Sequence, residues 1–127
     1  MSLTGLNVVA IDDTSSIRTF LRISLKTLGA DFHEASTAEE GLELCKSVSP
    51  DLVVLDLGLP DRDGLDILPE IKATGEKSPT VVVLTVRKEH EARAEAYRKG
   101  ADAYLTKPFM MDDLLEVIEE KFNRPIK

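Results

Sequence analysis

Short apolar runs alternate with longer amphipathic stretches along the chain. The apolar runs are Leu6 to Ile11, Leu52 to Leu55, Val81 to Leu84 and Ala103 to Leu105. Continuous apolar runs of this length are typical of strands in a parallel sheet, because both faces of such a sheet are buried. Asp31 to Ala35 is a weaker candidate for one more strand. The pattern therefore predicts five strands with helices between them.

Two helices are indicated in the first half of the chain. The first has an apolar face at helical spacing, which consists of Ile17, Phe20, Leu21, Leu25 and Leu28. Gly29 follows this face where the end of a helix favours glycine. Thr37 and Glu40 have the spacing of a capping box, so a second helix is expected from Ala38 to about Val48.

Three further helices are expected in the second half. Leu65, Leu68 and Ile71 mark a short helix that ends near Gly75 and contains Pro69 in its first turns. The helix at about 88–99 is rich in alanine and lacks a wide apolar stripe, so it should pack lightly. The last helix covers about 111–122. Strands that alternate with helices in this way predict an α/β domain with a parallel sheet and a functional crevice at the carboxyl ends of the strands.

Composition narrows the class of protein. The length of 127 residues is that of one domain, and residues 1–127 are expected to form a single unit. A net charge of −7 argues against direct nucleic-acid binding. The chain shows neither a leader nor a membrane-spanning run, so it is expected to be cytoplasmic and to have no membrane partner. Its single cysteine, Cys45, is expected to be a small core residue.

Polar side chains follow the predicted strands. The set consists of Asp12 and Asp13 after the first strand, Asp56 after the third, Thr85 at the end of the fourth and Lys107 after the fifth. Three carboxylates that converge repel one another unless a cation compensates them. Oxygen ligands suit Mg²⁺. His33 and His90 lie away from these positions and are expected to be ordinary surface residues, so zinc is not indicated.

A carboxylate beside Mg²⁺ and a lysine is equipped to accept a phosphoryl group, because this transfer depends on positioning and charge neutralisation. Asp56 is the best candidate for the nucleophile. Four segments together carry a family resemblance: Ile11 to Asp13, Leu55 to Gly64, Leu84 to Thr85 and Tyr104 to Phe109. From about Asn7 to Phe122 the chain resembles the receiver domain of two-component response regulators, of the chemotaxis-regulator type.

The resemblance implies a flavodoxin-like (βα)₅ fold, a three-layer sandwich around a parallel five-stranded sheet of order 2-1-3-4-5. It implies that Asp56 is the phosphoacceptor, that Asp13 and Asp56 bind Mg²⁺ directly, and that Asp12 acts mainly through a bound water. The backbone carbonyl of Gly58 would complete the metal ligands.

The resemblance also assigns roles at the fourth and fifth strands. Lys107 would pair with the phosphoryl oxygens, and its bond to Pro108 would be cis. Thr85 would hydrogen-bond the phosphoryl group. Tyr104 would turn inward in response and reshape the face made by the fourth helix, the fifth strand and the fifth helix.

The implied biology is bacterial phosphorelay signal transduction. The phosphoryl donor would be a sensor histidine kinase or a histidine phosphotransfer protein, and the domain would catalyse only its own phosphorylation and dephosphorylation. The candidate contacts for that donor are Ser15, Arg18, Thr19, Arg22, Phe109 and Met110. An output domain or protein target and a homodimer are possible partners. Ala103 stands where many DNA-binding regulators have an acidic residue of their dimer face, which weakens dimerisation there.

Two residues depart from the family pattern. Val86 follows the switch threonine where a small residue is usual, and could crowd the phosphoryl site. Arg87 could screen the phosphoryl group or steer the hydrolytic water. We expect slower loss of the phosphoryl group as a result.

Two other classes of protein are the alternatives to a receiver domain. An aspartyl-phosphate hydrolase requires Asp-x-Asp-x-Thr, which Asp12-Asp13-Thr14 does not match. A flavodoxin-like electron carrier requires a first loop that holds the flavin phosphate, and the two aspartates would repel it.

Overall fold

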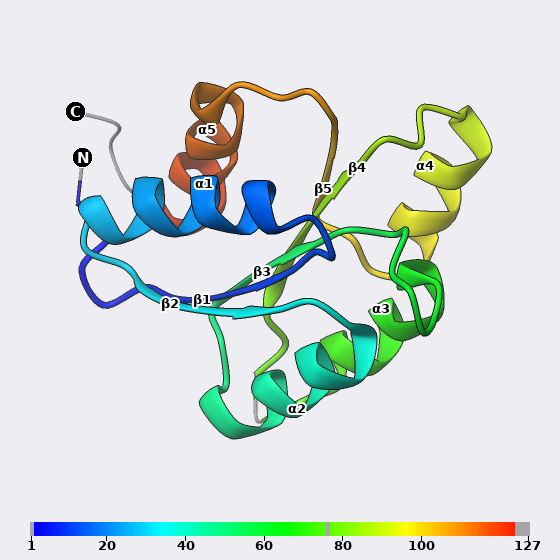
Figure 1. Cartoon of the computed structure of the whole chain (residues 1–127), viewed down its shortest axis with the longest axis horizontal. Helices are drawn as coiled ribbons and strands as arrows, with labels where there is room; N and C mark the ends of the chain where they lie inside the picture. The colour runs from blue at the N-terminus through cyan, green and yellow to red at the C-terminus, as the bar shows by residue number, and fades with distance from the viewer. Residues whose placement is uncertain (1, 76, 124–127) are drawn as a thin grey trace.

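A computed structural model describes residues 2–75 and 77–123, and within them five parallel strands lie between two layers of helices (Figure 1). The strands are β1 (Asn7–Ile11), β2 (Asp31–Ala35), β3 (Leu52–Leu55), β4 (Thr80–Thr85) and β5 (Ala103–Thr106). Their order is β2-β1-β3-β4-β5. The register pairs Val8 with Leu52 and Thr85 with Thr106. The predicted fold class and strand order are confirmed.

The helices are α1 (Ser15–Thr27), α2 (Ala38–Val48), α3 (Gly64–Lys72), α4 (His90–Arg98) and α5 (Met111–Phe122). In Figure 1, α1 and α5 lie on one side of the sheet, and α2 and α3 lie on the other. Helices α2 and α5 begin at the positions expected from the sequence, and α4 begins within two residues of its expected start. Pro69 lies in the second turn of α3, where its missing N–H leaves the carbonyl of Leu65 without the usual helical donor.

Each face of the sheet carries its own apolar core. Leu21 and Leu25 of α1 pack with Leu114 and Ile118 of α5 over one face. The other core contains Leu42 and Cys45 of α2, Leu68 and Ile71 of α3, and Ala96 of α4. Cys45 is fully buried, as predicted. Burial of apolar surface on both faces fixes the sheet, and with it the edge at which the strands end.

The helix ends confirm the local signals in the sequence. The side-chain oxygen of Thr37 accepts a hydrogen bond from the backbone N–H of Glu40 at 3.2 Å, which caps α2 as expected. Gly29 has φ +103° directly after α1. A residue with a side chain is strained at such an angle, so the glycine ends this helix cleanly.

One core prediction was wrong. Phe20 is 44% exposed and does not face the sheet with the rest of its predicted stripe. Its ring packs edge-to-face with that of Phe109, from the loop after β5, at a centroid distance of 5.8 Å.

The light packing of α4 is confirmed, because Ala96 is the one buried residue of this helix, all of which the structure describes. Within residues 2–75 and 77–123, no helix has the length and apolar character required to cross a bilayer.

Candidate functional site

The strand order brings the first two polar positions together. Because β1 and β3 are neighbours, Asp12 and Asp56 leave the sheet side by side. The backbone N–H of Asp12 donates to the carbonyl of Ala35 at 3.0 Å, and that of Asp56 donates to the carbonyl of Ile11 at 2.9 Å. These bonds extend the sheet by one residue beyond each strand and hold both aspartates in place. Both side chains are buried, whereas Asp13 is exposed.

Three carboxylates and one ammonium meet at this edge. Asp12, Asp13 and Asp56 each have one carboxylate oxygen within 4.8 Å of the other two. The Nζ atom of Lys107 lies 2.8 Å from Oδ2 of Asp12 and 3.4 Å from Oδ2 of Asp56. The backbone N–H of Lys107 donates to the carbonyl of Thr85 at 2.8 Å, which anchors the lysine at the ends of β4 and β5.

The electrostatics of this cluster favour a bound cation. Burial raises the pKa of Asp12, and the negative charge of Asp56 adds to the rise. Hydrogen bonds from Lys107 and from the backbone N–H of Thr14 act in the opposite direction. One ammonium cannot neutralise three carboxylates, and the donor atoms are all oxygen. A hard divalent ion such as Mg²⁺ fits this set.

The loop between β3 and α3 is folded tightly against Asp56. The backbone N–H of Gly58 donates to Oδ1 of Asp56 at 3.3 Å, and that of Gly64 donates to the carbonyl of Leu57 at 2.8 Å. A Cβ atom on Gly64 would lie 2.6 Å from the Asp56 carbonyl oxygen, so only glycine permits this approach. Asp63 caps α3 by accepting from the N–H of Leu65 at 2.9 Å.

The remaining predicted residues lie at the ends of β4 and β5. Thr85 is fully buried. Tyr104 points inward, and its hydroxyl donates to the backbone carbonyl of Arg87 at 2.8 Å. Burial raises the pKa of Tyr104. The guanidinium of Arg93, on α4, lies 5.7 Å from the centre of this ring, within range of a cation–π contact. The peptide bond between Lys107 and Pro108 is cis, as the resemblance implied.

The two residues that depart from the family pattern differ in their surroundings. Val86 is 67% exposed. The guanidinium of Arg87 pairs with the carboxylate of Asp63 at 3.1 Å, a contact that no sequence pattern predicted. Arg87 and Asp63 are 24 positions apart and belong to different loops, so no local pattern indicates that they pair.

The candidate donor contacts divide into two groups. Arg18 and Arg22 are engaged within the chain, since both pair with Glu34 of β2. Arg18 also donates to the backbone carbonyl of Asp12 at 2.8 Å. The others lie beside the acidic site on α1 and on the loop after Lys107; Ser15 and Met110 are exposed, and Thr19 and Phe109 are half-buried.

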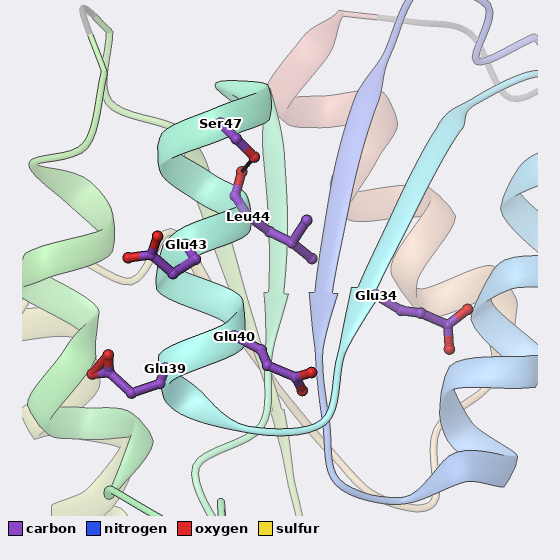
Figure 2. A pocket seen from close by; sticks show the side chains of 6 residues that line it. All are labelled: Glu34, Glu39, Glu40, Glu43, Leu44 and Ser47. Carbon is purple, nitrogen blue, oxygen red and sulfur yellow. Dashed lines mark hydrogen bonds between the residues drawn. The ribbon is translucent and has the colours of Figure 1, made fainter.

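A cavity of about 580 Å³ lies between α2 and the edge strand β2. Figure 2 shows its lining, which consists of Glu34, Glu39, Glu40, Glu43, Leu44 and Ser47. Four glutamates repel an anionic ligand, and no residue of the acidic cluster lines this space.

His33 is half-buried and His90 is exposed, and neither belongs to the acidic cluster, as predicted.

Comparisons with known proteins agree with this geometry. The family model of the response regulator receiver domain matches residues 8–119. The KDP operon transcriptional regulatory protein KdpE of Escherichia coli is 39% identical over 108 residues, which are 85% of this chain and 47% of KdpE. The chain thus spans about half the length of this curated relative.

Two solved structures have the same fold. The CheY-like receiver domain protein from Methanospirillum hungatei has a TM-score of 0.85 and 29% identity, over 93% of this chain and 94% of that one. The BeF3-activated DrrB receiver domain has a TM-score of 0.83 and 30% identity, over 98% of this chain and all of its own.

Proposed function

The chain belongs to the family of response regulator receiver domains of two-component systems, and on this premise we propose that Asp56 is its phosphoacceptor. The observation that carries the proposal is the meeting of Asp12, Asp13 and Asp56 with the ammonium of Lys107 at one edge of the sheet. Membership of this family leaves the two alternatives, an aspartyl-phosphate hydrolase and a flavin-binding electron carrier, without support.

In the proposed reaction, a carboxylate oxygen of Asp56 attacks the phosphorus of the donor. The bond between phosphorus and the donor atom breaks, and the leaving group keeps the electron pair, which gives an acyl phosphate on Asp56. Lys107 pairs with the oxygens of the transferred group as their charge develops. Thr85 assists, because its hydroxyl oxygen accepts from the N–H of Arg87 at 3.3 Å and its own proton can then be donated.

The metal site proposed here consists of Asp13 and Asp56 as direct ligands, Asp12 through a water, and the backbone carbonyl of Gly58. When bound, Mg²⁺ would neutralise carboxylate charge and polarise the phosphoryl oxygens. In support, the three carboxylates are close enough to share one ion, and Gly58 lies beside Asp56 in the tight loop. The solved structure of the DrrB receiver domain, which is 30% identical to this chain, is of its BeF3-activated form, and BeF3 resembles a phosphoryl group in shape and charge.

The proposed donor is a sensor histidine kinase or a histidine phosphotransfer protein, which would reach Asp56 over α1 and the loop after Lys107. The proposed response is a change at the face of α4, β5 and α5, where Tyr104 lies. The output would come from a further domain, as the greater length of KdpE suggests, or from a separate target protein. Homodimerisation, a cytoplasmic location, the lack of turnover on other substrates and the extent of the domain over 1–127 stay predictions.

The decisive experiment follows the intact mass of the protein during incubation with Mg²⁺ and acetyl phosphate. We expect one phosphoryl group to be added, and to be absent from Asp56→Asn and from metal-free samples. Asp66→Asn is the matched control, because Asp66 is an exposed aspartate on α3 outside the site. Beryllofluoride binding is measured in parallel. If the wild-type protein neither gains the group nor binds beryllofluoride, Asp56 is not the acceptor.

A further inference from the structure

The side chain of Arg87 connects the two loops that border the acidic cluster. Arg87 lies in the loop after β4, and its Nη1 atom is 3.1 Å from Oδ2 of Asp63. Its Nη2 atom donates to the backbone carbonyl of Leu57 at 3.4 Å. Leu57 directly follows Asp56, and Asp63 directly precedes α3. One guanidinium therefore contacts both ends of the loop 57–63 between Asp56 and α3, which is called the acceptor loop below.

The backbone of Arg87 contacts the two proposed switch residues. Its N–H donates to the hydroxyl oxygen of Thr85 at 3.3 Å, and its carbonyl accepts from the hydroxyl of Tyr104 at 2.8 Å. The position of this one residue thus sets the orientation of the Thr85 hydroxyl and the inward placement of Tyr104. A fork of guanidinium donors suits such a link, because it holds a carboxylate and a carbonyl at once.

We propose that Arg87 is a positioning residue for phosphoryl transfer to Asp56, which fixes the acceptor loop to the loop that carries Thr85. The inference rests on the function proposed above. Arg87 acts through Asp63 and Leu57 and does not contact the phosphoryl group. This role differs from the screening of the phosphoryl group that the sequence alone suggested for this residue. Tyr104 is connected to the acceptor loop through the same residue, because its hydroxyl donates to the Arg87 carbonyl while the Arg87 guanidinium contacts Asp63 and Leu57.

The kinetic test is a double-mutant cycle on the rate of adduct formation from acetyl phosphate. Arg87→Gln removes the guanidinium, and Asp63→Asn removes the charge while it keeps an oxygen that can cap α3. A half-exposed ion pair stabilises the geometry that it holds by about 0.2–1 kcal/mol. If all of this energy is lost from the transition state, each variant should form the adduct roughly up to fivefold more slowly. The double variant should form the adduct no more slowly than the slower single variant, because both changes break the same contact between Arg87 and Asp63.

Two control variants distinguish the geometry of the Arg87 guanidinium from its positive charge. Lys88→Gln removes one positive charge from the neighbouring exposed residue and should leave the rate unchanged. Arg87→Lys keeps the charge but loses the fork, and its rate should lie between those of the wild type and Arg87→Gln. If Arg87→Gln is slow while Asp63→Asn reacts normally, the arginine acts directly by its charge and the proposal is overturned. Additive effects in the double variant would overturn it too.

A spectroscopic readout tests the link to Tyr104 without any phosphoryl donor. The chain has two tyrosines, so Tyr97→Phe leaves Tyr104 as the single fluorescent reporter. In that background, Arg87→Gln and Asp63→Asn should make Tyr104 more accessible to acrylamide, and Lys88→Gln should not. Unchanged quenching in both variants would reject the link. Failure of the wild type to take up a phosphoryl group would reject the proposed function instead, which keeps the two results distinct.

Discussion

The ammonium of Lys107, at the carboxyl end of β5, lies 2.8 Å from Oδ2 of Asp12, at the carboxyl end of β1. Two strands, β3 and β4, separate the strands that carry these residues. The contact is nearly enclosed, since the side chains are 12% and 2% exposed. Loss of the ammonium would therefore leave the buried carboxylates of Asp12 and Asp56 without their cation, whereas Lys107 without Asp12 would still lie 3.4 Å from Asp56.

Replacement of Lys107 by methionine should separate phosphoryl transfer from metal binding. Adduct formation should fall roughly 10²-fold, because one donor to the developing charge is lost. Mg²⁺ should bind at least as tightly, because the ammonium no longer competes for the carboxylates. Rates from intact mass and affinities from calorimetry provide the measurement, with Lys88→Met as the control for loss of a surface charge. A weaker affinity for Mg²⁺ would show that Lys107 supports the metal site.

Local sequence signals predicted most of the fold. The strand β3 is four apolar residues in a row, and the structure buries all four. Thr37 was expected to cap α2 from its spacing to Glu40, and it does. These features depend on neighbours in the chain, or on the general rule that apolar segments are buried. The edge of the sheet where Asp12, Asp13 and Asp56 meet follows from the parallel arrangement, so the acidic cluster was also predictable.

Contacts between separate loops could not be predicted in this way. The pairing of Arg87 with Asp63 requires the loops after β3 and β4 to be in place first. Asp61 is a second case, because its carboxylate accepts from the N–H groups of Ala38 and Glu39 at the start of α2. The prediction for Phe20 was wrong because it too depends on a contact with a separate loop. Its helical spacing fits the core, but its ring packs against Phe109 in the loop after β5.

Gly64→Ala should destabilise the domain and disturb the acceptor loop. The added Cβ would lie 2.6 Å from the Asp56 carbonyl oxygen and 2.7 Å from Cα of Leu57, so backbone must move. We expect a loss of about 1–3 kcal/mol in the free energy of unfolding, measured by urea denaturation. Gly58→Ala is the matched control for stability, because a Cβ there meets nothing within 4 Å. Equal stabilities of the two variants would contradict this account.

The thiol of Cys45 should be nearly inert in the folded protein. Burial raises its pKa from 9.0 to about 11, which lowers the thiolate fraction near pH 8 by roughly 10²-fold. The side chain is also fully enclosed by the core, so a reagent needs local unfolding to reach it. Labelling with a maleimide, followed by mass spectrometry, should be slow in buffer and fast in guanidinium chloride. Rapid labelling of the native protein would show that α2 opens readily.

Asp61 should make stability depend on pH in the acid range. Hydrogen bonds from the backbone N–H groups of Ala38 and Glu39 lower its pKa below the ordinary value of 3.8. Because the folded pKa is depressed, this contribution is fully present above 3.8 and is lost as the pH falls through the folded value. Protonated Asp61 resembles asparagine, so the wild type should be more stable than Asp61→Asn at neutral pH, and the difference should shrink in acid.

Thermal unfolding of both proteins across this pH range measures that difference, and an NMR titration of the Asp61 carboxyl carbon locates the folded pKa directly. Asp31→Asn is the matched control, because Asp31 is an exposed aspartate where β2 begins, at the opposite end of the sheet. A difference between the wild type and Asp61→Asn that stays constant with pH would mean that the carboxylate charge adds nothing to the cap. In that case the asparagine amide oxygen would serve α2 equally well, and the link between the acceptor loop and α2 would not depend on charge.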